Sequence, residues 1–196
     1  MTKAVEFFFD VGSPASYLAW TQLPGICEQA GASLVYKPML LGGVFQATGN
    51  ASPATIPVKG RYVSHDLARF ARRYGVPFAS NPHFPILTLT LMRAAVGVQV
   101  RQPERLDNYL SAVFQALWVE SLNLNDADLV ARTLERGGFD PAQVEQWVSD
   151  PEIKAALKAN TDEALQRGVF GAPTMFVGQE MFFGQDRLDF VREALG

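Results

Sequence analysis

The sequence contains a single cysteine, Cys27, among its 196 residues. A lone cysteine cannot form a disulfide within the chain, and no Cys-x-x-Cys pair is present to carry out thiol–disulfide exchange. No apolar run reaches the roughly 18 residues that a membrane-spanning helix requires, and the first residues lack the charged and apolar regions of a signal peptide. These absences predict a cytoplasmic protein with no membrane partner, and they argue against a secreted enzyme that forms disulfides.

A strong charge of either sign is also missing. The chain has 17 Lys and Arg residues against 20 Asp and Glu residues, a formal net charge of −3. Without a block of basic residues, we expect no nucleic-acid partner. Two separated histidines and one cysteine offer no ligand spacing for a metal ion, so we expect no metal site. The 48% of hydrophobic and 19% of charged residues are typical of a globular protein.

The start of the chain predicts a β-α-β unit. Residues 4–10 form a short apolar and aromatic run bounded by a Gly-Ser-Pro turn, which is typical of a buried strand. Ser13 followed by proline indicates a helix start, and Gly31 indicates its end. Pro24 lies within this helix, so we expect a kink or a break there. A second strand over 33–38 would run parallel to the first, because the connection is long enough for a crossover helix.

The middle of the chain is predicted to be almost entirely helical. Residues 41–57 are rich in Gly, Ala, Ser, Thr and Pro, and we interpret them as a long loop of the kind that is often functional. Residues 86–100 begin with strand-like alternation, but their total length favours a helix. The other predicted helices cover residues 58–75, 103–119, 126–136, 141–148 and 151–167.

The end of the chain returns to strands. Residues 173–177 and 180–183 are separated by a Gly-Gln turn, which predicts a β-hairpin. A last helix is expected over 186–195. The complete order is therefore β-α-β, a helical block, and β-β-α.

Ser13 is the first candidate functional residue. It lies between a buried strand and a helix start, where free N–H groups and the positive end of the helix dipole favour an anion. A thiolate at such a point has a lowered pKa, and the hydroxyl of Ser13 could give it one more hydrogen bond. The alternative is that Ser13 only caps the helix, as serine commonly does.

The pair Ala172-Pro173 is the second candidate for a functional role. A proline at a strand start can be cis, and it leaves the backbone groups of Ala172 free to pair with an extended, peptide-like ligand. The alternative is an ordinary trans proline on an edge strand.

These residues also carry a family resemblance that covers nearly the whole chain. The motif Ser13-Pro-Ala-Ser-Tyr17, the segment Val169 to Phe176 and the turn Phe183-Gly-Gln-Asp-Arg187 resemble those of 2-hydroxychromene-2-carboxylate isomerases. The segment from Lys59 to Pro77, with its Tyr, Asp and Arg spacing, also matches. That family is related to the kappa-class glutathione transferases, and both are similar to disulfide oxidoreductases of the DsbA type.

The resemblance implies an α/β fold: a thioredoxin-like fold with an inserted all-helical domain. This agrees with the predicted order of elements. It places the thioredoxin-like domain at residues 1–42 and 160–196 and the inserted helical domain at residues 43–159.

The resemblance further implies glutathione as the cofactor. Ser13 would contact the glutathione sulfur, and Ala172, before a cis Pro173, would pair with the cysteinyl backbone. The turn would hold the γ-glutamyl end, with Asp186 on its ammonium group. Positions that line the site in the kappa class match Asn50 and Lys59, although a turn residue and a solvated lysine are the alternatives. The full predicted cofactor site is Ser13, Asn50, Lys59, Ala172, Pro173, Phe183, Gly184, Gln185 and Asp186.

Because a serine replaces the redox cysteine, the nucleophile would come from the ligand. In the isomerases that this chain resembles, the glutathione thiolate adds to an unsaturated substrate, the ring opens, a former double bond rotates, and elimination releases the product with glutathione unchanged. We therefore predict a glutathione-dependent isomerase acting on a small aromatic or bicyclic carboxylate. The alternatives are a kappa-like glutathione transferase or peroxidase, and a non-catalytic module that binds a thiol peptide. A homodimer is the base-rate expectation.

On the substrate side, the sequence departs from the family. The well-characterised isomerases carry a substrate-binding lysine after the second strand, and the matching position here is Phe45. We expect Phe45, His83 and Phe84 to face the substrate. His83 is a candidate general acid or base, with a structural histidine in a turn as the alternative.

Overall fold

The computed structural model of the chain describes residues 3–196; Met1 and Thr2, the first two residues of the predicted N-terminal segment, lie outside the described residues. One mixed sheet is built from both ends of the chain. Its strands are β1 (Ala4–Phe9), β2 (Ser33–Pro38), β3 (Thr174–Val177) and β4 (Glu180–Phe183), in the order β2-β1-β3-β4. β1 pairs with β2 in parallel and with β3 antiparallel. The predicted strands, the parallel pair and the hairpin are confirmed.

The aromatic run of β1 fills both faces of this sheet. Successive side chains of a strand point to opposite faces. Phe7 and Phe9 belong to the main core, whereas Phe8 packs with Phe176 on the other face, and all three phenylalanines of β1 are fully buried. β1 is therefore held from both sides, and the turn that follows it starts from a fixed position.

α1 (Pro14–Ala30) begins and ends where the sequence predicts, with Ser13 as its N-cap and Gly31 as its C-cap. The expected break at Pro24 is absent, because the helix is continuous through that residue. Pro24 faces solvent while its neighbours Leu23 and Ile26 are buried in the core. Packing of the buried face maintains the helix where the proline removes one hydrogen bond.

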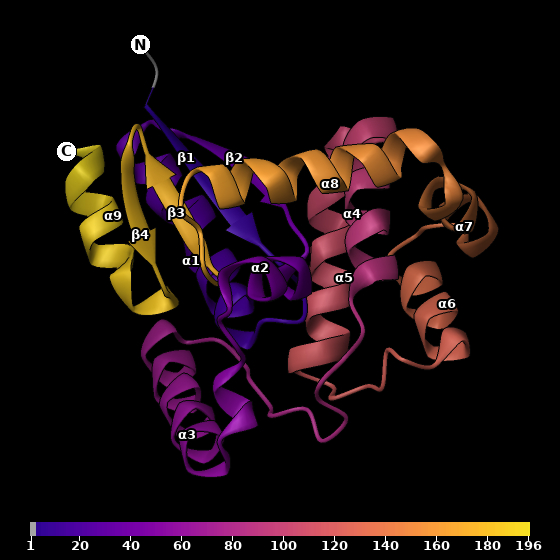
Figure 1. Cartoon of the computed structure of the whole chain (residues 1–196), viewed down its shortest axis with the longest axis horizontal. Coiled ribbons are helices and arrows are strands. Elements are labelled where there is room, and N and C mark those ends of the chain that lie inside the picture. Colours follow the sequence, from indigo (N-terminus) through magenta and orange to yellow (C-terminus); the bar gives the residue numbers. More distant parts are fainter. Residues whose placement is uncertain (1–2) are drawn as a thin grey trace.

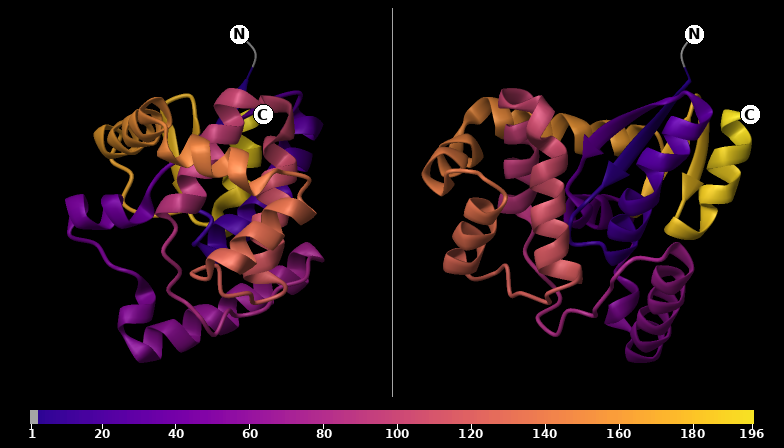
Figure 2. Two further views of the ribbon diagram at one scale, coloured as in Figure 1. Left: turned by 90° about the vertical axis from the view of Figure 1, so that its right-hand side faces the viewer. Right: turned by 180° about the vertical axis from the view of Figure 1, so that it is seen from behind.

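The central part of the chain is helical, as predicted. Figure 1 shows α8 running from the sheet to the bundle of α4, α5 and α7, while α9 lies beside β4 at the far edge and α3 stands below the sheet. Figure 2 shows α1 on the side of the sheet opposite α8. The helices are α2 (Leu41–Thr48), α3 (Pro57–Tyr74), α4 (Leu89–Arg101), α5 (Leu106–Trp118), α6 (Ala127–Arg136), α7 (Pro141–Ser149), α8 (Pro151–Gln166) and α9 (Leu188–Leu195), with 3₁₀ turns η1 (Pro53–Thr55), η2 (Pro103–Arg105) and η3 (Gln185–Arg187).

The interpretation of residues 41–57 as a loop is wrong, since α2 and η1 occupy much of this segment. The glycine-rich composition misled the prediction because long-range contacts stabilise the helix. The Leu40 N–H donates to Thr161 Oγ1 at 3.0 Å and the Leu41 N–H to Asp10 Oδ2 at 2.9 Å. Val44 is fully buried in the cluster that also contains Phe8. Tertiary packing outweighs weak local propensity here.

Candidate active site

Ser13 lies in a tight turn between β1 and α1. Its backbone N–H donates to the Asp10 carbonyl at 3.0 Å. Its side-chain Oγ accepts the Ser16 N–H at 3.1 Å, the bond expected of an N-cap, and donates to the carbonyl oxygen of Ala172, also at 3.1 Å. Only 6% of the residue is exposed. Ser13 therefore caps α1. Its hydroxyl also contacts the segment that carries Ala172 and Pro173, so capping is not its only contact.

That segment contains a cis peptide bond between Ala172 and Pro173. The Pro173 carbonyl accepts the Gly184 N–H at 2.9 Å. Gly184 has φ +101°, and a Cβ on it would lie 2.5 Å from Asp186 Oδ1, so only glycine fits this turn. The structure thus brings Ser13, Ala172, Pro173 and the turn after β4 together at one end of the sheet.

The amino end of α1 points to this place. Pro14 has no N–H, and the Ser16 N–H is used by Ser13 Oγ. The N–H of Ala15 belongs to the first turn, where a helix supplies no carbonyl acceptor. Together with the helix dipole, it favours a negative charge next to Ser13. The buried hydroxyl of Ser16 has no hydrogen-bond partner among the described residues.

The turn after β4 combines one buried and one exposed side chain. Gln185 is buried, and its carbonyl accepts a hydrogen bond from the Tyr74 hydroxyl of α3. The side chain of Asp186 is 38% exposed, and its Oδ2 lies 2.7 Å from Arg187 Nη1. A ligand ammonium could therefore reach Asp186, but it would compete with Arg187 for the carboxylate. Phe183, 41% exposed, packs against Phe170 with ring centroids 4.6 Å apart.

Asn50 and Lys59 differ in how the structure places them. Asn50 follows α2, and its Nδ2 donates to the Phe170 carbonyl at 2.8 Å, two residues before Ala172. This bond connects Asn50 with the segment that carries the cis proline. Lys59 lies exposed in the first turn of α3, beside an apolar hollow of about 400 Å³ lined also by Pro53, Val58, Tyr62 and Val63. Among the described residues, no hydrogen bond or ion pair joins Lys59 to the residues around Ser13.

The three predicted substrate residues lie on segments tied to the Ser13 turn. Phe45 is half-buried on α2. Phe84 is half-buried and packs on Trp118 with ring centroids 6.2 Å apart, and the Trp118 indole donates to the Val11 carbonyl at 2.8 Å. The side chain of His83 is exposed, and its backbone N–H donates to Asn81 Oδ1 at 2.8 Å. Phe84 is thus connected with the residues before Ser13 through Trp118, whereas the exposed side chain of His83 has no hydrogen bond among the described residues.

Comparison with known proteins decides the family. A family model for the DSBA-like thioredoxin domain matches residues 4–196. The 2-hydroxychromene-2-carboxylate isomerase of Sphingobium xenophagum is 31% identical over 197 residues, covering 100% of this chain and 99% of that protein. A solved structure of a 2-hydroxychromene-2-carboxylate isomerase matches with a TM-score of 0.84 at 32% identity, covering 98% of this chain and 94% of the other.

The chain belongs to the 2-hydroxychromene-2-carboxylate isomerase family.

As a member of this isomerase family, the chain is an enzyme with a DsbA-like thioredoxin fold, which confirms the predicted fold class. Glutathione S-transferase kappa 1 of Homo sapiens is 27% identical and covers 100% of this chain and 92% of its own length. A probable DsbA oxidoreductase from Streptomyces coelicolor shares the fold, with a TM-score of 0.77 at 18% identity. The wider group therefore joins isomerases and transferases on one fold.

Asp10 is the residue of this isomerase that sequence reasoning missed. Its carboxylate ends β1 and accepts three hydrogen bonds, from the Gly12 N–H and the Leu41 N–H at 2.9 Å and from Thr88 Oγ1 at 3.0 Å. Its two oxygens thereby tie together the Ser13 turn, the start of α2 and the start of α4. A Cβ on Gly12 would lie 2.6 Å from Thr88 Cγ2, so a larger residue there would force Thr88 to shift. An acid directly after the aromatic run of β1 was the available signal.

The buried Asp10 carboxyl should make stability depend on pH. Burial raises the pKa of Asp10, although its hydrogen bonds to Leu41, Gly12 and Thr88 oppose the rise. In the unfolded chain the pKa is about 3.9. The folded protein therefore keeps the proton where the unfolded chain has lost it, and the contribution of Asp10 to stability falls as pH rises from about 4 through the folded-state pKa.

Urea unfolding of the wild type and Asp10→Asn between pH 4 and pH 7 measures this dependence. The wild type should lose free energy of unfolding relative to the variant as the pH rises. Titration of all other groups cancels in the difference between the two proteins. A wild type that gains stability relative to Asp10→Asn over this range would contradict the assignment.

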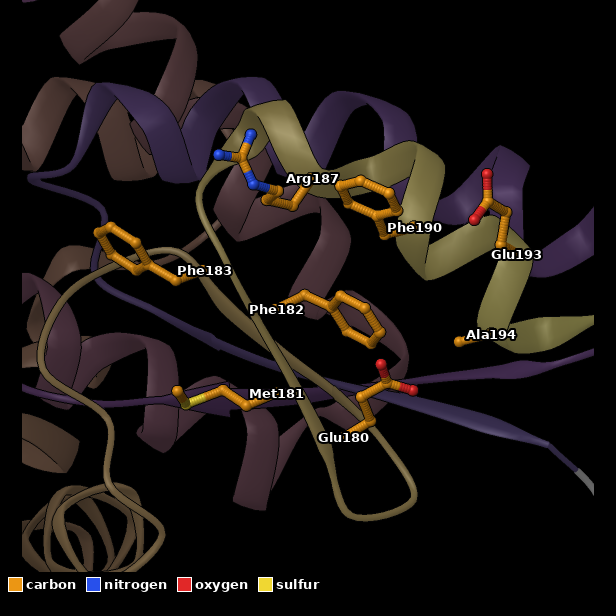
Figure 3. Close-up of a pocket in the computed structure, with 8 residues that line it drawn as sticks. All are labelled: Glu180, Met181, Phe182, Phe183, Arg187, Phe190, Glu193 and Ala194. Atoms are coloured by element: carbon orange, nitrogen blue, oxygen red, sulfur yellow. The ribbon is translucent and has the colours of Figure 1, made fainter.

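A separate hollow of about 630 Å³ lies between β4 and α9. Figure 3 shows Phe182, Phe190 and Ala194 gathered between the strand and the helix, with Arg187 and Glu180 toward opposite ends. Ser13 and Ala172 do not line it. The hollow therefore borders the candidate active site only at Phe183 and Arg187.

Three further observations concern groups outside the site. Cys27 is buried, and burial raises the pKa of its thiol, which disfavours the reactive thiolate form. Within residues 3–196, no helix combines the length and the apolar character needed to cross a membrane. The same residues contain no group of three or more His, Cys, Asp or Glu side chains arranged to hold a metal ion.

Proposed function

We propose that this protein is a glutathione-dependent isomerase whose substrate is a small aromatic or bicyclic carboxylate. The observation that carries the proposal is the hydroxyl of Ser13 at the amino end of α1, hydrogen-bonded to the carbonyl that precedes the cis proline. The relatives named 2-hydroxychromene-2-carboxylate isomerase support this reaction class.

The residues present fit glutathione. The tripeptide offers a thiol, a peptide backbone, an ammonium group and two carboxylates. Ser13 and the N–H of Ala15 suit the sulfur as a thiolate, and the backbone of Ala172 suits the cysteinyl unit. Asp186 suits the ammonium group. Asn50 borders the same segment through Phe170, and Lys59 would have to reach the glycyl carboxylate with its flexible side chain.

When bound, glutathione supplies a thiolate that can add reversibly to an unsaturated carbon of the substrate and leave again. The protein's part is to stabilise and position that charge. The hydroxyl of Ser13 would donate to the sulfur, the first turn of α1 would add its dipole, and Asp10 holds the Gly12 N–H in the turn that carries Ser13. Electrostatic stabilisation and orientation of this kind are usually the largest contributions to an enzyme's rate.

On the substrate side, Phe45 and Phe84 offer aromatic surface for a bicyclic ring. With Phe45 at the position of the family's lysine, the substrate carboxylate would need another partner. His83 is exposed and remains a candidate acid or base for the proton that moves during ring opening.

An absorbance assay with 2-hydroxychromene-2-carboxylate tests the proposal. Isomerisation should require glutathione in catalytic amounts, and the concentration of free thiol should not change. S-methylglutathione, which has no thiol, is the matched control and should support no turnover. Turnover that is equally fast without any thiol would contradict the proposal.

A kappa-like transferase is the second candidate, favoured by the full-length similarity to the human kappa enzyme. A transferase would consume one thiol for each electrophile converted. Titrating the remaining thiol while following 1-chloro-2,4-dinitrobenzene therefore separates the two activities. Binding of glutathione with neither activity would instead favour a thiol-peptide binding module.

A further inference from the structure

Two parts of the chain that are distant in sequence hold the turn between β4 and α9. Gly184 donates its N–H to the Pro173 carbonyl at 2.9 Å, which connects the turn with the cis-proline segment. The carbonyl of the next residue, Gln185, accepts a hydrogen bond from the Tyr74 hydroxyl. Tyr74 is the last residue of α3, and Figures 1 and 2 show one end of α3 beside this turn. The turn that carries Asp186 is therefore held by the entry to β3 and by a helix from the middle of the chain.

The hydrogen bond from Tyr74 fixes the peptide unit from which Asp186 projects. The Gln185 carbonyl and the Asp186 N–H belong to one planar group, so a donor on the carbonyl sets the orientation of both. Only 9% of Gln185 is exposed, and a buried carbonyl that loses its donor destabilises the structure by its desolvation penalty. Without the hydroxyl, this peptide unit would have to turn toward water, and the carboxylate of Asp186 would move with it.

The surroundings of Tyr74 keep its hydroxyl available as a donor. The ring is half-buried and packs on Phe70 of the same helix, with ring centroids 5.7 Å apart. Burial and the nearby carboxylates of Asp189 and Asp186 raise the pKa of Tyr74 to about 12. The hydroxyl therefore keeps its proton at neutral pH, and it can hold the turn under the conditions in which an enzyme of this family would work.

From these contacts we propose that Tyr74 is a positioning residue for the ammonium end of glutathione. The inference rests on the proposed function, because it takes Asp186 as the partner of that ammonium group. Tyr74 fixes the peptide between Gln185 and Asp186 before the ligand binds, and preorganisation of this kind increases affinity because less has to be ordered on binding. The bond acts on the turn and not on Ser13. Its loss should therefore raise the glutathione concentration needed for half-maximal rate and leave the rate at saturating glutathione unchanged.

Isothermal titration calorimetry of the wild type and Tyr74→Phe with two ligands tests this role. Glutathione carries the ammonium group, and glutaryl-cysteinylglycine differs from it only in lacking that group. Tyr74→Phe keeps the ring and removes the hydroxyl, so it should weaken glutathione binding by about two- to tenfold. The affinity for glutaryl-cysteinylglycine should change little, because this ligand has no ammonium group for Asp186 to hold.

Tyr36→Phe is the matched control. It also removes a tyrosine hydroxyl that donates to another segment, here to Asp107 Oδ1 at 2.7 Å, but it does so from β2 at the opposite edge of the sheet. This variant should leave both affinities unchanged even where it lowers the free energy of unfolding. General damage to the fold would instead weaken the binding of both ligands by the same factor.

A second measurement uses Asp186→Ala as the background. If Tyr74 acts through Asp186, adding Tyr74→Phe to this variant should cause no further loss of glutathione affinity. Three results would overturn the inference and leave the proposed function standing: an unchanged glutathione affinity in Tyr74→Phe, equal losses for the two ligands, or a lower rate at saturating glutathione. A wild type that binds both ligands equally tightly would refute the contact between Asp186 and the ammonium group, and a wild type that binds neither would refute the glutathione site. In both of these cases the inference fails together with the proposed function.

Discussion

Replacing Ser13 with alanine is expected to lower the turnover number at saturating glutathione by about 10²-fold or more. The variant loses the side-chain hydroxyl that is proposed to donate to the sulfur, and removal of a single such donor typically reduces turnover by about 10² to 10³. Without this donor the thiolate is less stable, so the pKa of the bound thiol should rise. The turnover number of the variant should therefore rise with pH at higher pH values than the turnover number of the wild type does.

The measurement is the pH dependence of turnover, together with the thiolate absorbance of bound glutathione. Ser16→Ala is the matched control, because it removes a hydroxyl from the same motif that has no hydrogen-bond partner. Its effect on the pKa of the bound thiol should be much smaller. Equal effects of the two substitutions, or an unchanged rate in Ser13→Ala, would show that Ser13 only caps the helix.

Replacing Asp186 with alanine is expected to weaken glutathione binding by about tenfold or more. The carboxylate is the proposed partner of the ligand's ammonium group, and truncating one member of a charged pair at a binding interface commonly has an effect of this size or larger. Because the side chain is 38% exposed, solvent screening keeps the effect at the lower end. Calorimetry at low and moderate salt measures the loss and its ionic origin.

Two neighbouring variants sharpen the interpretation of Asp186. Asp186→Asn keeps the shape and removes the charge, so it should lose nearly as much affinity as the alanine variant. Arg187→Ala removes the cation that lies 2.7 Å from the same carboxylate, so it should bind glutathione at least as tightly as the wild type. Loss of affinity in Arg187→Ala with none in Asp186→Ala would place the ligand's carboxylate, and not its ammonium group, at this turn.

The parts of the fold that the sequence predicts well depend on signals between neighbours in the chain. The cap at Ser13, the stop at Gly31 and the hairpin after Pro173 each rest on the chemistry of two or three adjacent residues. The order of strands and helices follows from such signals and from the alternation of apolar residues. The family resemblance adds the way in which these elements are arranged.

The features that the sequence does not predict depend on distant residues. α2 exists although its first turn contains two glycines, because Thr161 and Asp10 satisfy the N–H groups at its start. The continuity of α1 through Pro24 likewise depends on the packing of its buried face. Sequence patterns of neighbouring residues do not reveal which distant residues will contact these segments.

The residues of the candidate site likewise divide into those that a local motif identifies and those that depend on distant contacts. Ser13, Ala172 and the Gly184 turn could be selected by motif, and the structure places them together. The roles of Lys59, Phe45 and His83 stay predictions, because their side chains lie outside the network of hydrogen bonds around Ser13. Asp10 was missed although an acid after an apolar strand was visible in the sequence, because two of its three partners lie 31 and 78 positions away along the chain.

The position of Asp10 has a consequence for how enzymes of this type can diversify. It anchors α2 and α4 at their first residues, whereas Phe45 and the His83-Phe84 turn lie beyond those anchor points. Under the proposed function, mutations at Phe45, His83 or Phe84 would change the substrate side of the site and leave the hydrogen bonds of Asp10 to the Ser13 turn in place. Such a separation would let new electrophiles be tried while the proposed thiolate step is inherited unchanged.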